Sequence, residues 1–521
     1  MMTRLNVLCL VLACLGGAAQ GATWYLDKDA RGAGTGASWP DAWATPAQIG
    51  RNLKPGDTLY ISGGAHEKIY SGGWIIANGG TAGAPIRIAV DSGNPMHNGK
   101  VIFDWAHAGE EANTNGFVLK GYVTFDGGVN GAQHIVFRNL VNYLNKGVGI
   151  VLRGSGTWGV EVRYCRFENV NGGISISNCS GIVIENSSFV GIRGDAAISL
   201  GSHGSWDANH IRHCDIEVLT NGVSPPGRTS YNGPDGIQAT DGLSAYNNTF
   251  RVSPTTVYTS PQHPDMLQVN GRCLKVYNNE FINIGDSGIS PSPWFADQPI
   301  GDIWIFNNVF RNEQVMGKYP EFIRMYNNKG LPFFYNVKIL NNTFLDATNG
   351  NTNFIKFGQE EGNPPGSGNE IKNNMFYNVG AGNSYVISLP ISKAGPTGQS
   401  HWEFDGNTYF HPNPVYSRLI VAGAIYKAAD WVAAKEPNGS TTDPRLVRYS
   451  PWARNNDLRL LPRTSDKGPR GVDLSHLCSE MPALSFDKAG NMRTPGSWGV
   501  GAYGLTREVS RPTGFRVLPL K

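Results

Sequence analysis

The sequence is short of charge for its length. Lys, Arg, Asp and Glu make up only 16% of its 521 residues, and the formal net charge is +3. So small an excess of positive charge gives no basis for binding nucleic acid. Long apolar runs are absent after the N-terminus, which argues against a transmembrane helix in the rest of the chain. Low charge does not predict disorder here, because 40% of the residues are hydrophobic and can form a core. We expect a folded monomer with no nucleic-acid partner and no transmembrane segment.

Closely paired cysteines are missing as well. Two of the seven cysteines lie near the N-terminus, and the other five show no Cys-x-x-Cys spacing, so we expect no zinc site. Arg4 precedes the apolar run LNVLCLVLACLGGAA, which small residues follow, and this is the pattern of an export signal. We therefore expect a signal peptide over residues 1–21 and a secreted or periplasmic protein. The tetrapeptide VLAC loosely fits a lipoprotein signal, which makes lipid attachment at Cys14 the alternative.

Glycine is abundant, with 66 residues, and the chain repeats itself. The repeated phrase is an alternating strand followed by two asparagines, any residue and phenylalanine. It occurs as LSAYNNTF, LKVYNNEF, IWIFNNVF, VKILNNTF and EIKNNMF. Alternation indicates a half-buried strand, and Asn-Asn indicates a sharp corner because asparagine tolerates left-handed backbone geometry. A third short strand, such as MLQVN or FIKFG, lies between copies. We expect the asparagines to stack at one corner and the phenylalanines to point inward.

Three short strands per repeat predict an all-β fold, a right-handed parallel β-helix of about nine or ten coils. Because an open coil leaves a sheet edge exposed, we expect a cap at each end. Thr45 followed by Pro46 predicts a short N-terminal helix, and KAADWVAAKE predicts a helix near the other end. The predicted parts are an N-terminal cap with the first coils (22–100), the β-helix (101–410) and a loop-rich C-terminal capping region (411–521).

Further motifs lie near both ends of the mature chain. The N-terminal part contains TWYLDKDARGAGTGASWPDAWATPAQI, LKPGDTLYISGG and GGTAGAPIRIAV, and the C-terminal part contains DPRLV, NNDLRLLPRTSDKG and GVGAYG. Together with the coils, these motifs resemble those of secreted pectate-lyase-like β-helix proteins. The resemblance implies the fold but not one reaction, because polysaccharide lyases, glycoside hydrolases, epimerases and phage spikes share this scaffold.

The third strands offer a polar strip. When they are aligned on an inward Ile or Leu, the next residue points outward, and adjacent coils bring these side chains onto one face. The strip consists of Gln238, Gln268, Ser290, Arg324 and Lys356. Such a row suits an extended sugar chain, although any β-helix also needs a solvated face. In the neighbouring loops, Tyr258 and Trp294 are candidates for stacking on sugar rings.

Acidic residues precede the inward position by two residues in three of these strands, at Asp235, Asp265 and Glu321. The pattern is similar to that of polygalacturonase-like hydrolases, and this resemblance implies that Asp235 and Asp265 are the two catalytic aspartates. The residues around them depart from that family. Two carboxylates so close could share a proton, bind Ca²⁺ together with Asp286, or fix the turn before the strand.

We expect a carbohydrate-active enzyme that cleaves an acidic, uronate-containing polysaccharide by β-elimination. Arg324, Lys356 and His263 would provide the base and neutralise the substrate carboxylate. The first alternative is a polygalacturonase-like glycoside hydrolase that uses Asp235 and Asp265. The second alternative is a non-catalytic protein that binds glycan on the same strip. Ca²⁺, bound by Asp235, Asp265 and Asp286, is the only cofactor that the sequence suggests.

Overall fold

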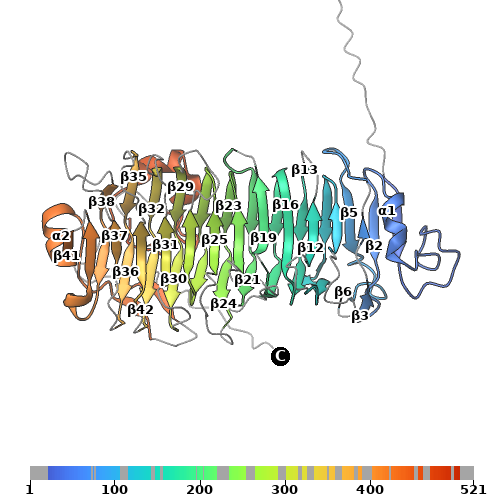
Figure 1. The fold of residues 1–521 in the computed structure, drawn as a ribbon, viewed down its shortest axis with the longest axis horizontal. Helices are drawn as coiled ribbons and strands as arrows, with labels where there is room; N and C mark the ends of the chain where they lie inside the picture. The colour runs from blue at the N-terminus through green and yellow to red at the C-terminus, as the bar shows by residue number, and fades with distance from the viewer. Residues whose placement is uncertain are drawn as a thin grey trace, which may run out of the picture.

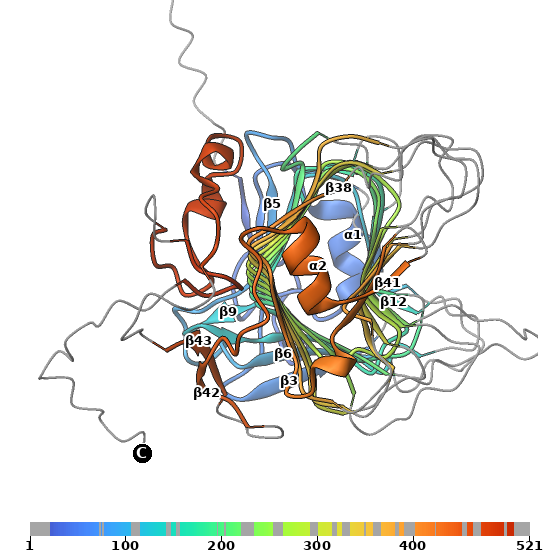
Figure 2. The same ribbon diagram turned by 90° about the vertical axis from the view of Figure 1, so that its left-hand side faces the viewer.

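The computed structural model is a parallel β-helix, an elongated stack of coils that confirms the predicted fold (Figure 1). Three sheets, here named A, B and C, contain 13, 12 and 14 strands. Seen along the axis, the sheets form the walls of one continuous coil (Figure 2). The described residues are 21–71, 74–75, 78–105, 115–141, 147–152, 157–194, 196–202, 205–219, 234–253, 264–291, 301–314, 320–325, 334–348, 351–357, 366–380, 385–389, 402–421, 424–450, 456–461, 470–493 and 498–504.

Sheet A contains the strands that lead into the asparagine corner. Its neighbouring strands follow one another in the order of the coils. They are β1 (Thr23–Leu26), β2 (Thr58–Ile61), β5 (Ile86–Val90), β8 (Val123–Asp126), β14 (Glu161–Arg163), β17 (Ile182–Glu185), β20 (Asn209–Arg212), β23 (Leu243–Tyr246), β26 (Leu274–Tyr277), β29 (Gly301–Phe306), β32 (Tyr335–Leu340), β35 (Asn369–Lys372) and β38 (Trp402–Asp405).

Sheet B follows the corner and carries the inward phenylalanines. Its strands are β3 (Glu67–Tyr70), β6 (Lys100–Asp104), β11 (Ile135–Arg138), β15 (Cys165–Glu168), β18 (Ser188–Ile192), β21 (Asp215–Val218), β24 (Thr249–Val252), β27 (Glu280–Ile282), β30 (Val309–Asn312), β33 (Thr343–Asp346), β36 (Met375–Asn378) and β39 (Thr408–Phe410).

Sheet C contains the predicted third strands. In chain order they are β4 (Trp74–Ile75), β7 (Phe117–Leu119), β12 (Val148–Leu152), β13 (Thr157–Trp158), β16 (Gly172–Ser180), β19 (Ala196–Ser202), β22 (Asp235–Ala239), β25 (Asp265–Val269), β28 (Ser287–Pro291), β31 (Glu321–Met325), β34 (Asn353–Phe357), β37 (Ile387–Leu389), β40 (Arg418–Val421) and β41 (Ala424–Lys427). Only β41 joins it antiparallel, at the C-terminal edge. Within residues 101–410, sheet A has ten strands, from β8 to β38, in agreement with the nine or ten coils predicted there. The earlier strands β1, β2 and β5 are the first coils expected before residue 101.

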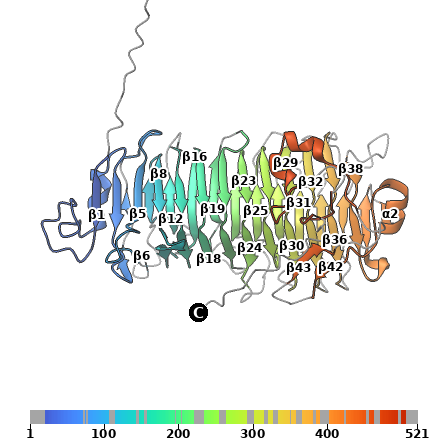
Figure 3. The same cartoon turned by 180° about the vertical axis from the view of Figure 1, so that it is seen from behind.

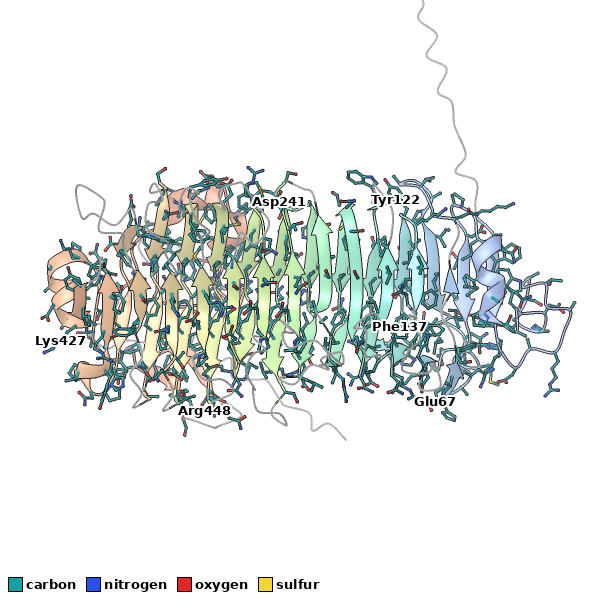
Figure 4. All side chains as sticks on the ribbon, viewed as in Figure 1. Glu67, Tyr122, Phe137, Asp241, Lys427 and Arg448 are labelled. Atoms are coloured by element: carbon teal, nitrogen blue, oxygen red, sulfur yellow. The ribbon has the colours of Figure 1, made fainter. Side chains whose placement is uncertain are left out.

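Short helices lie at the two ends of the stack. A 3₁₀ turn (Pro46–Gln48) leads into α1 (Ile49–Asn52), where the Thr45–Pro46 signal predicted a helix. Helix α2 (Ala428–Lys435) lies at the opposite end, and Figure 4 labels Lys427 directly before it. The remaining elements are the hairpins β9 (Gly128–Val129) with β10 (Ala132–Gln133) and β42 (Leu446–Arg448) with β43 (Asp457–Leu460), and the 3₁₀ turns Pro414–Tyr416, Ser475–Ser479 and Pro482–Ser485.

The second asparagine of each Asn-Asn pair forms a ladder along the corner between sheets A and B. Its Oδ1 accepts hydrogen bonds from both the backbone N and the Nδ2 of the ladder asparagine one coil earlier, and both distances are 3.0 Å between Asn279 and Asn308. The first asparagine of each pair takes the left-handed backbone that turns the corner, with φ of 57° at Asn278. The predicted ladder is therefore confirmed, and it comprises Asn248, Asn279, Asn308, Asn342, Asn374 and also Asn407.

The ladder ends on a buried carboxylate. Glu436, which follows α2 and is fully buried, accepts hydrogen bonds at Oε1 from the backbone N and the Nδ2 of Asn407, both at 2.8 Å. Its Oε2 accepts from the Tyr409 hydroxyl at 2.8 Å and from the Trp431 indole at 3.1 Å. Burial raises the pKa of Glu436 to about 7, although these four donors oppose the rise. The C-terminal helix is thus joined to the ladder.

Phenylalanine rings stack inside sheet B one coil above another. The centroids of Phe250 and Phe281 lie 4.8 Å apart, and those of Phe281 and Phe310 lie 4.6 Å apart, with interplanar angles of 6° and 7°. The stack continues through Phe344 and Phe376. All five rings are fully buried. The core therefore repeats one side chain at one position, as the sequence predicts.

The chain after the coils returns along the outside of sheet A (Figures 2 and 3). We call the described residues 470–493 and 498–504 the C-terminal segment. Outward asparagines of the corner donate from Nδ2 to its carbonyls: Asn307 to Phe486 at 2.7 Å and Asn341 to Gly499 at 2.8 Å. Apolar residues of the segment pack against Trp304, Phe306 and Leu340 of sheet A. The segment therefore covers the outside of several coils.

Replacing Phe281 with alanine should lower the free energy of unfolding by about 3 to 5 kcal/mol, because it removes one ring from a continuous buried stack. Phe486→Ala is the control, because Phe486 is 42% exposed and its loss should change stability by less than about 1 kcal/mol. Denaturant unfolding measures both. Equal, small effects would contradict the inward stack.

Glu436→Gln should change how stability depends on pH. The pKa of Glu436 rises from 4.5 to about 7 on folding, so its contribution is fully present below pH 4.5 and is lost as the pH rises towards 7. Between pH 4 and pH 8 the wild type should therefore lose about 3 kcal/mol of unfolding free energy relative to Glu436→Gln. Glu403→Gln, at an exposed carboxylate, should show no such shift. Parallel pH profiles for wild type and Glu436→Gln would contradict the buried carboxylate.

Candidate functional site

The predicted polar strip lies on the outer face of sheet C. In the register of the strands, Gln238 pairs with Gln268, and Gln268 pairs with Ser290. Ile289 pairs with Ile323, so the residues that follow them, Ser290 and Arg324, are also neighbours. Arg324 in turn pairs with Lys356. The inward Ile and Leu side chains beside them are fully buried. The five side chains therefore follow one line across neighbouring coils, as expected.

Asp235 joins two neighbouring strands of the strip. It is fully buried at the start of β22, and its Oδ1 accepts a hydrogen bond of 2.9 Å from the backbone N of Asp265. Its Oδ2 accepts one of 2.8 Å from Gln238 Nε2. One oxygen therefore holds the next strand, while the other orients a side chain of the strip.

Asp265, one coil on, is held by a guanidinium. Arg324 Nη2 donates to Asp265 Oδ1 at 3.0 Å and to Oδ2 at 3.3 Å, and the Ser287 hydroxyl also donates to Oδ1. Arg324 Nη1 donates to Asp286, so the guanidinium bridges two carboxylates. Asp265 is fully buried, and the Arg324 side chain is 14% exposed. These contacts stabilise the ionised form of the Asp265 carboxylate.

Glu321 occupies the same position in β31 as Asp265 does in β25, with Ser287 of β28 between them. Its Oε1 accepts a hydrogen bond from Lys356 Nζ, and its Oε2 lies 3.7 Å from Arg324 Nε. Burial raises the pKa of Glu321 above its ordinary value, and the neighbouring Lys356 and Arg324 oppose that rise. Lys356 is the more exposed of the two cations, at 34%.

The structure thus joins Arg324 to Asp265 and Asp286, and Lys356 to Glu321. Asp235 belongs to β22, three strands from Arg324 and four from Lys356 in sheet C. Asp265 and Asp286 both bind Arg324, so a calcium ion held by these carboxylates would have to displace the guanidinium. The described residues contain no group of three His, Cys, Asp or Glu side chains placed to hold a metal ion. The arrangement leaves one cation, Lys356, partly exposed on the face of sheet C.

Three predicted site residues, Tyr258, His263 and Trp294, lie outside the described residues, as do residues 1–20 of the expected signal peptide, including Cys14. Glu321 was not among the predicted site residues, although it binds both cations. Its sequence position, two residues before an inward isoleucine as in Asp235, was the available signal. Among the described residues, no helix has the length and apolar character needed to cross a membrane.

No protein-family model and no curated protein sequence matches the chain. Solved structures similar to it include XylC in complex with xylose, at 10% identity and a TM-score of 0.49, over 93% of this chain and 98% of that one. Pectate lyase Pel9A is 14% identical with a TM-score of 0.33, over 94% and 98%. The GH136 lacto-N-biosidase from Eubacterium ramulus is 13% identical with a TM-score of 0.38, over 63% of this chain, which spans 64% of that protein. None of these similarities identifies a reaction for this chain.

Replacing Arg324 with methionine should destabilise the protein by about 3 to 5 kcal/mol, because it leaves the fully buried Asp265 carboxylate without its cation. Adding Asp265→Asn to Arg324→Met should recover a large part of this loss. Arg166→Met, at a half-exposed pair with Glu168, is the control and should cost less than about 1 kcal/mol. Additive effects of Arg324→Met and Asp265→Asn would contradict a direct ion pair.

Proposed function

We propose that this protein is a carbohydrate-active enzyme that cleaves an acidic, uronate-containing polysaccharide by β-elimination on the outer face of sheet C. The observation that carries the proposal is the adjacent pair of cations, Arg324 and Lys356, on a strip otherwise lined by uncharged polar side chains. Gln268 and Ser290 are buried in this strip, so Gln238 and the partly exposed Lys356 ammonium are the groups suited to contact sugars that carry carboxylates. The enzyme is proposed to act outside the cytoplasm, with residues 1–21 as its signal peptide.

Elimination needs a cation and a base. A base removes the proton on the carbon next to the uronate carboxylate, the electron pair of that bond forms a carbon–carbon double bond, and the bond to the glycosidic oxygen breaks. The leaving oxygen takes up a proton. The proton on carbon can be removed only if the charge that develops on the carboxylate is stabilised. Lys356 takes this neutralising role in our proposal.

Lys356 is poorly suited to be the base. Its ammonium donates to the buried Glu321 carboxylate, which stabilises the protonated form of the amine. Arg324 is occupied by Asp265 and Asp286, so it acts as a positioning residue that holds β25 and β31 together. We therefore assign the base to His263, whose sequence position is two residues before Asp265 and whose residue type most often serves as a general base.

Hydrolysis by Asp235 and Asp265 receives less support. Both carboxylates are fully buried, and each already accepts hydrogen bonds from neighbouring protein groups. A hydrolase would need one of the pair to reach the glycosidic oxygen and the other to reach water or the anomeric carbon. Elimination makes no such demand, because the two aspartates can remain structural.

The reaction is tested by digesting a panel of uronate polymers while following ultraviolet absorbance and reducing ends together. Elimination predicts that both rise in parallel, because each cleavage creates a conjugated double bond. Reducing ends without absorbance would instead establish hydrolysis. Retention on a uronate polymer without any cleavage would establish the binding protein. A chelator should leave activity unchanged if Lys356, and not calcium, neutralises the carboxylate.

Variants separate the proposed roles on whichever polymer responds. His263→Ala should lower kcat by about 10²-fold or more, the usual contribution of a general base. Lys356→Met should lower kcat strongly, while Lys356→Arg should retain part of the activity because the positive charge remains. Lys275→Met, on the outer face of sheet A, is the matched control and should leave kcat and KM unchanged. Full activity in Lys356→Met would contradict the neutralising role.

A further inference from the structure

The C-terminal segment contains a buried cation with no acidic partner. The Arg493 residue is only 7% exposed, and its Nη2 donates to Asn307 Oδ1 at 2.9 Å and, at longer range, to the carbonyls of Gly501 and Ala502. Its Nε and Nη1 are buried and have no hydrogen-bond partner. No carboxylate of the described residues forms an ion pair with it. Three of the five N–H groups of this guanidinium therefore remain unused.

Asp487 influences Arg493 electrostatically but is bound elsewhere. Its Oδ1 accepts from the backbone N of Ala489 and of Asn491, at 2.9 and 2.8 Å. Its Oδ2 accepts from Asn491 Nδ2 at 3.0 Å and from the backbone N of Gly504 at 2.9 Å. Four donors of the C-terminal segment thus occupy this carboxylate, which leaves the guanidinium without a contacting anion.

Trp498 adds another unused donor beside the guanidinium. The centroid of its ring lies 5.4 Å from Arg493 Cζ, and its indole Nε1 is buried without a partner. The residue is 2% exposed and packs in the cluster that the C-terminal segment forms with sheet A. Stacking on the ring stabilises the cation but satisfies none of its N–H groups. Burial lowers the pKa of Arg493 to about 10, which reflects a charge poorly compensated by its surroundings.

Unused N–H donors and an uncompensated charge are rare in protein interiors, because each is costly to remove from water. Water could satisfy the donors but not the charge. We propose that Arg493 Nε and Nη1, with Trp498 Nε1, bind a small inorganic oxyanion of the phosphate or sulfate type between the C-terminal segment and the corner of sheets A and B. An oxyanion provides several acceptors at once and neutralises the guanidinium, which binds such anions well.

The bound ion has a structural consequence that does not depend on the proposed reaction. Arg493 belongs to the C-terminal segment, whereas its partner Asn307 belongs to the coil. An ion held here would bind only when the segment is docked, so it would stabilise the folded protein in proportion to its occupancy. The sheet C face is not involved, so enzymatic activity need not be measured.

The test is thermal unfolding of the full-length protein in increasing sodium sulfate or sodium phosphate, with sodium chloride at matched ionic strength. Sulfate and phosphate stabilise most proteins gradually through exclusion from the surface, so the diagnostic feature is an additional rise in Tm that saturates. The wild type and the control Arg459→Met, at an arginine 47% exposed, should both show it. Arg493→Met should lose the saturating part and keep the gradual one.

A second variant keeps the proposal testable if Arg493→Met fails to fold. Trp498→Phe retains the stacked ring but lacks the N–H, so half-saturation should need an oxyanion concentration about tenfold higher. Absence of a saturating rise in the wild type would overturn the proposal. So would a saturating rise that neither Arg493→Met nor Trp498→Phe changes. Equal saturation by chloride would overturn the assignment to an oxyanion.

Discussion

The stacked hydrogen bonds of the inner asparagines fix how each coil from Asn248 to Asn407 lies on the next. Each ladder asparagine accepts from the backbone N and the Nδ2 of the previous one, as Asn342 does from Asn308. A slip of one residue would leave buried amide groups without partners, and such groups cost free energy comparable to a lost hydrogen bond. The ladder therefore fixes the register of sheets A and B, and that in turn sets the register of sheet C and of its polar strip.

A fixed register places equivalent side chains directly above one another in successive coils. This arrangement is favourable for aromatic rings and unfavourable for charges of the same sign. The phenylalanines gain from it, since parallel rings at successive positions share their faces. Carboxylates directly opposite one another would repel. At the position shared by Asp265 and Glu321, the strand between them carries the uncharged Ser287. Arg324 and Lys356 lie three residues after this position in β31 and β34. Like charges nevertheless lie in neighbouring strands at Asp235 and Asp265 and at Arg324 and Lys356. Each is compensated by partners of its own: Gln238 and a backbone N–H for Asp235, Arg324 for Asp265, and Glu321 for Lys356.

The sequence allowed prediction of the features that repeat. Asn-Asn-x-Phe located the corner and the ring stack, and the inward isoleucines gave the order of the strip from Gln238 to Lys356. It did not reveal that Glu436 ends the ladder, because a single glutamate after a helix has no repeated counterpart. Nor did it reveal the C-terminal segment on sheet A, whose contacts join residues such as Asn341 and Gly499, 158 positions apart. Charge partners within the site, such as Glu321 with Lys356, needed side-chain geometry that no repeat encodes.

The extent of the Asn-Asn pairs also has a physical reason. The ladder needs only the second asparagine of each pair, yet every corner from Asn247 to Asn374 has two. Earlier corners such as Tyr164-Cys165 and His213-Cys214 have another first residue with the same left-handed backbone. The C-terminal segment contacts the corner along the paired coils, through the amides of Asn307, Asn341 and Asn373 and through the carbonyl of Asn278, which Lys488 binds. Where no such contact exists, a tyrosine or histidine can turn the corner as well. The first asparagine therefore serves the returning chain through its side chain at Asn307, Asn341 and Asn373, whereas Asn247 contacts His213 of the coil before it. The second asparagine serves the coil.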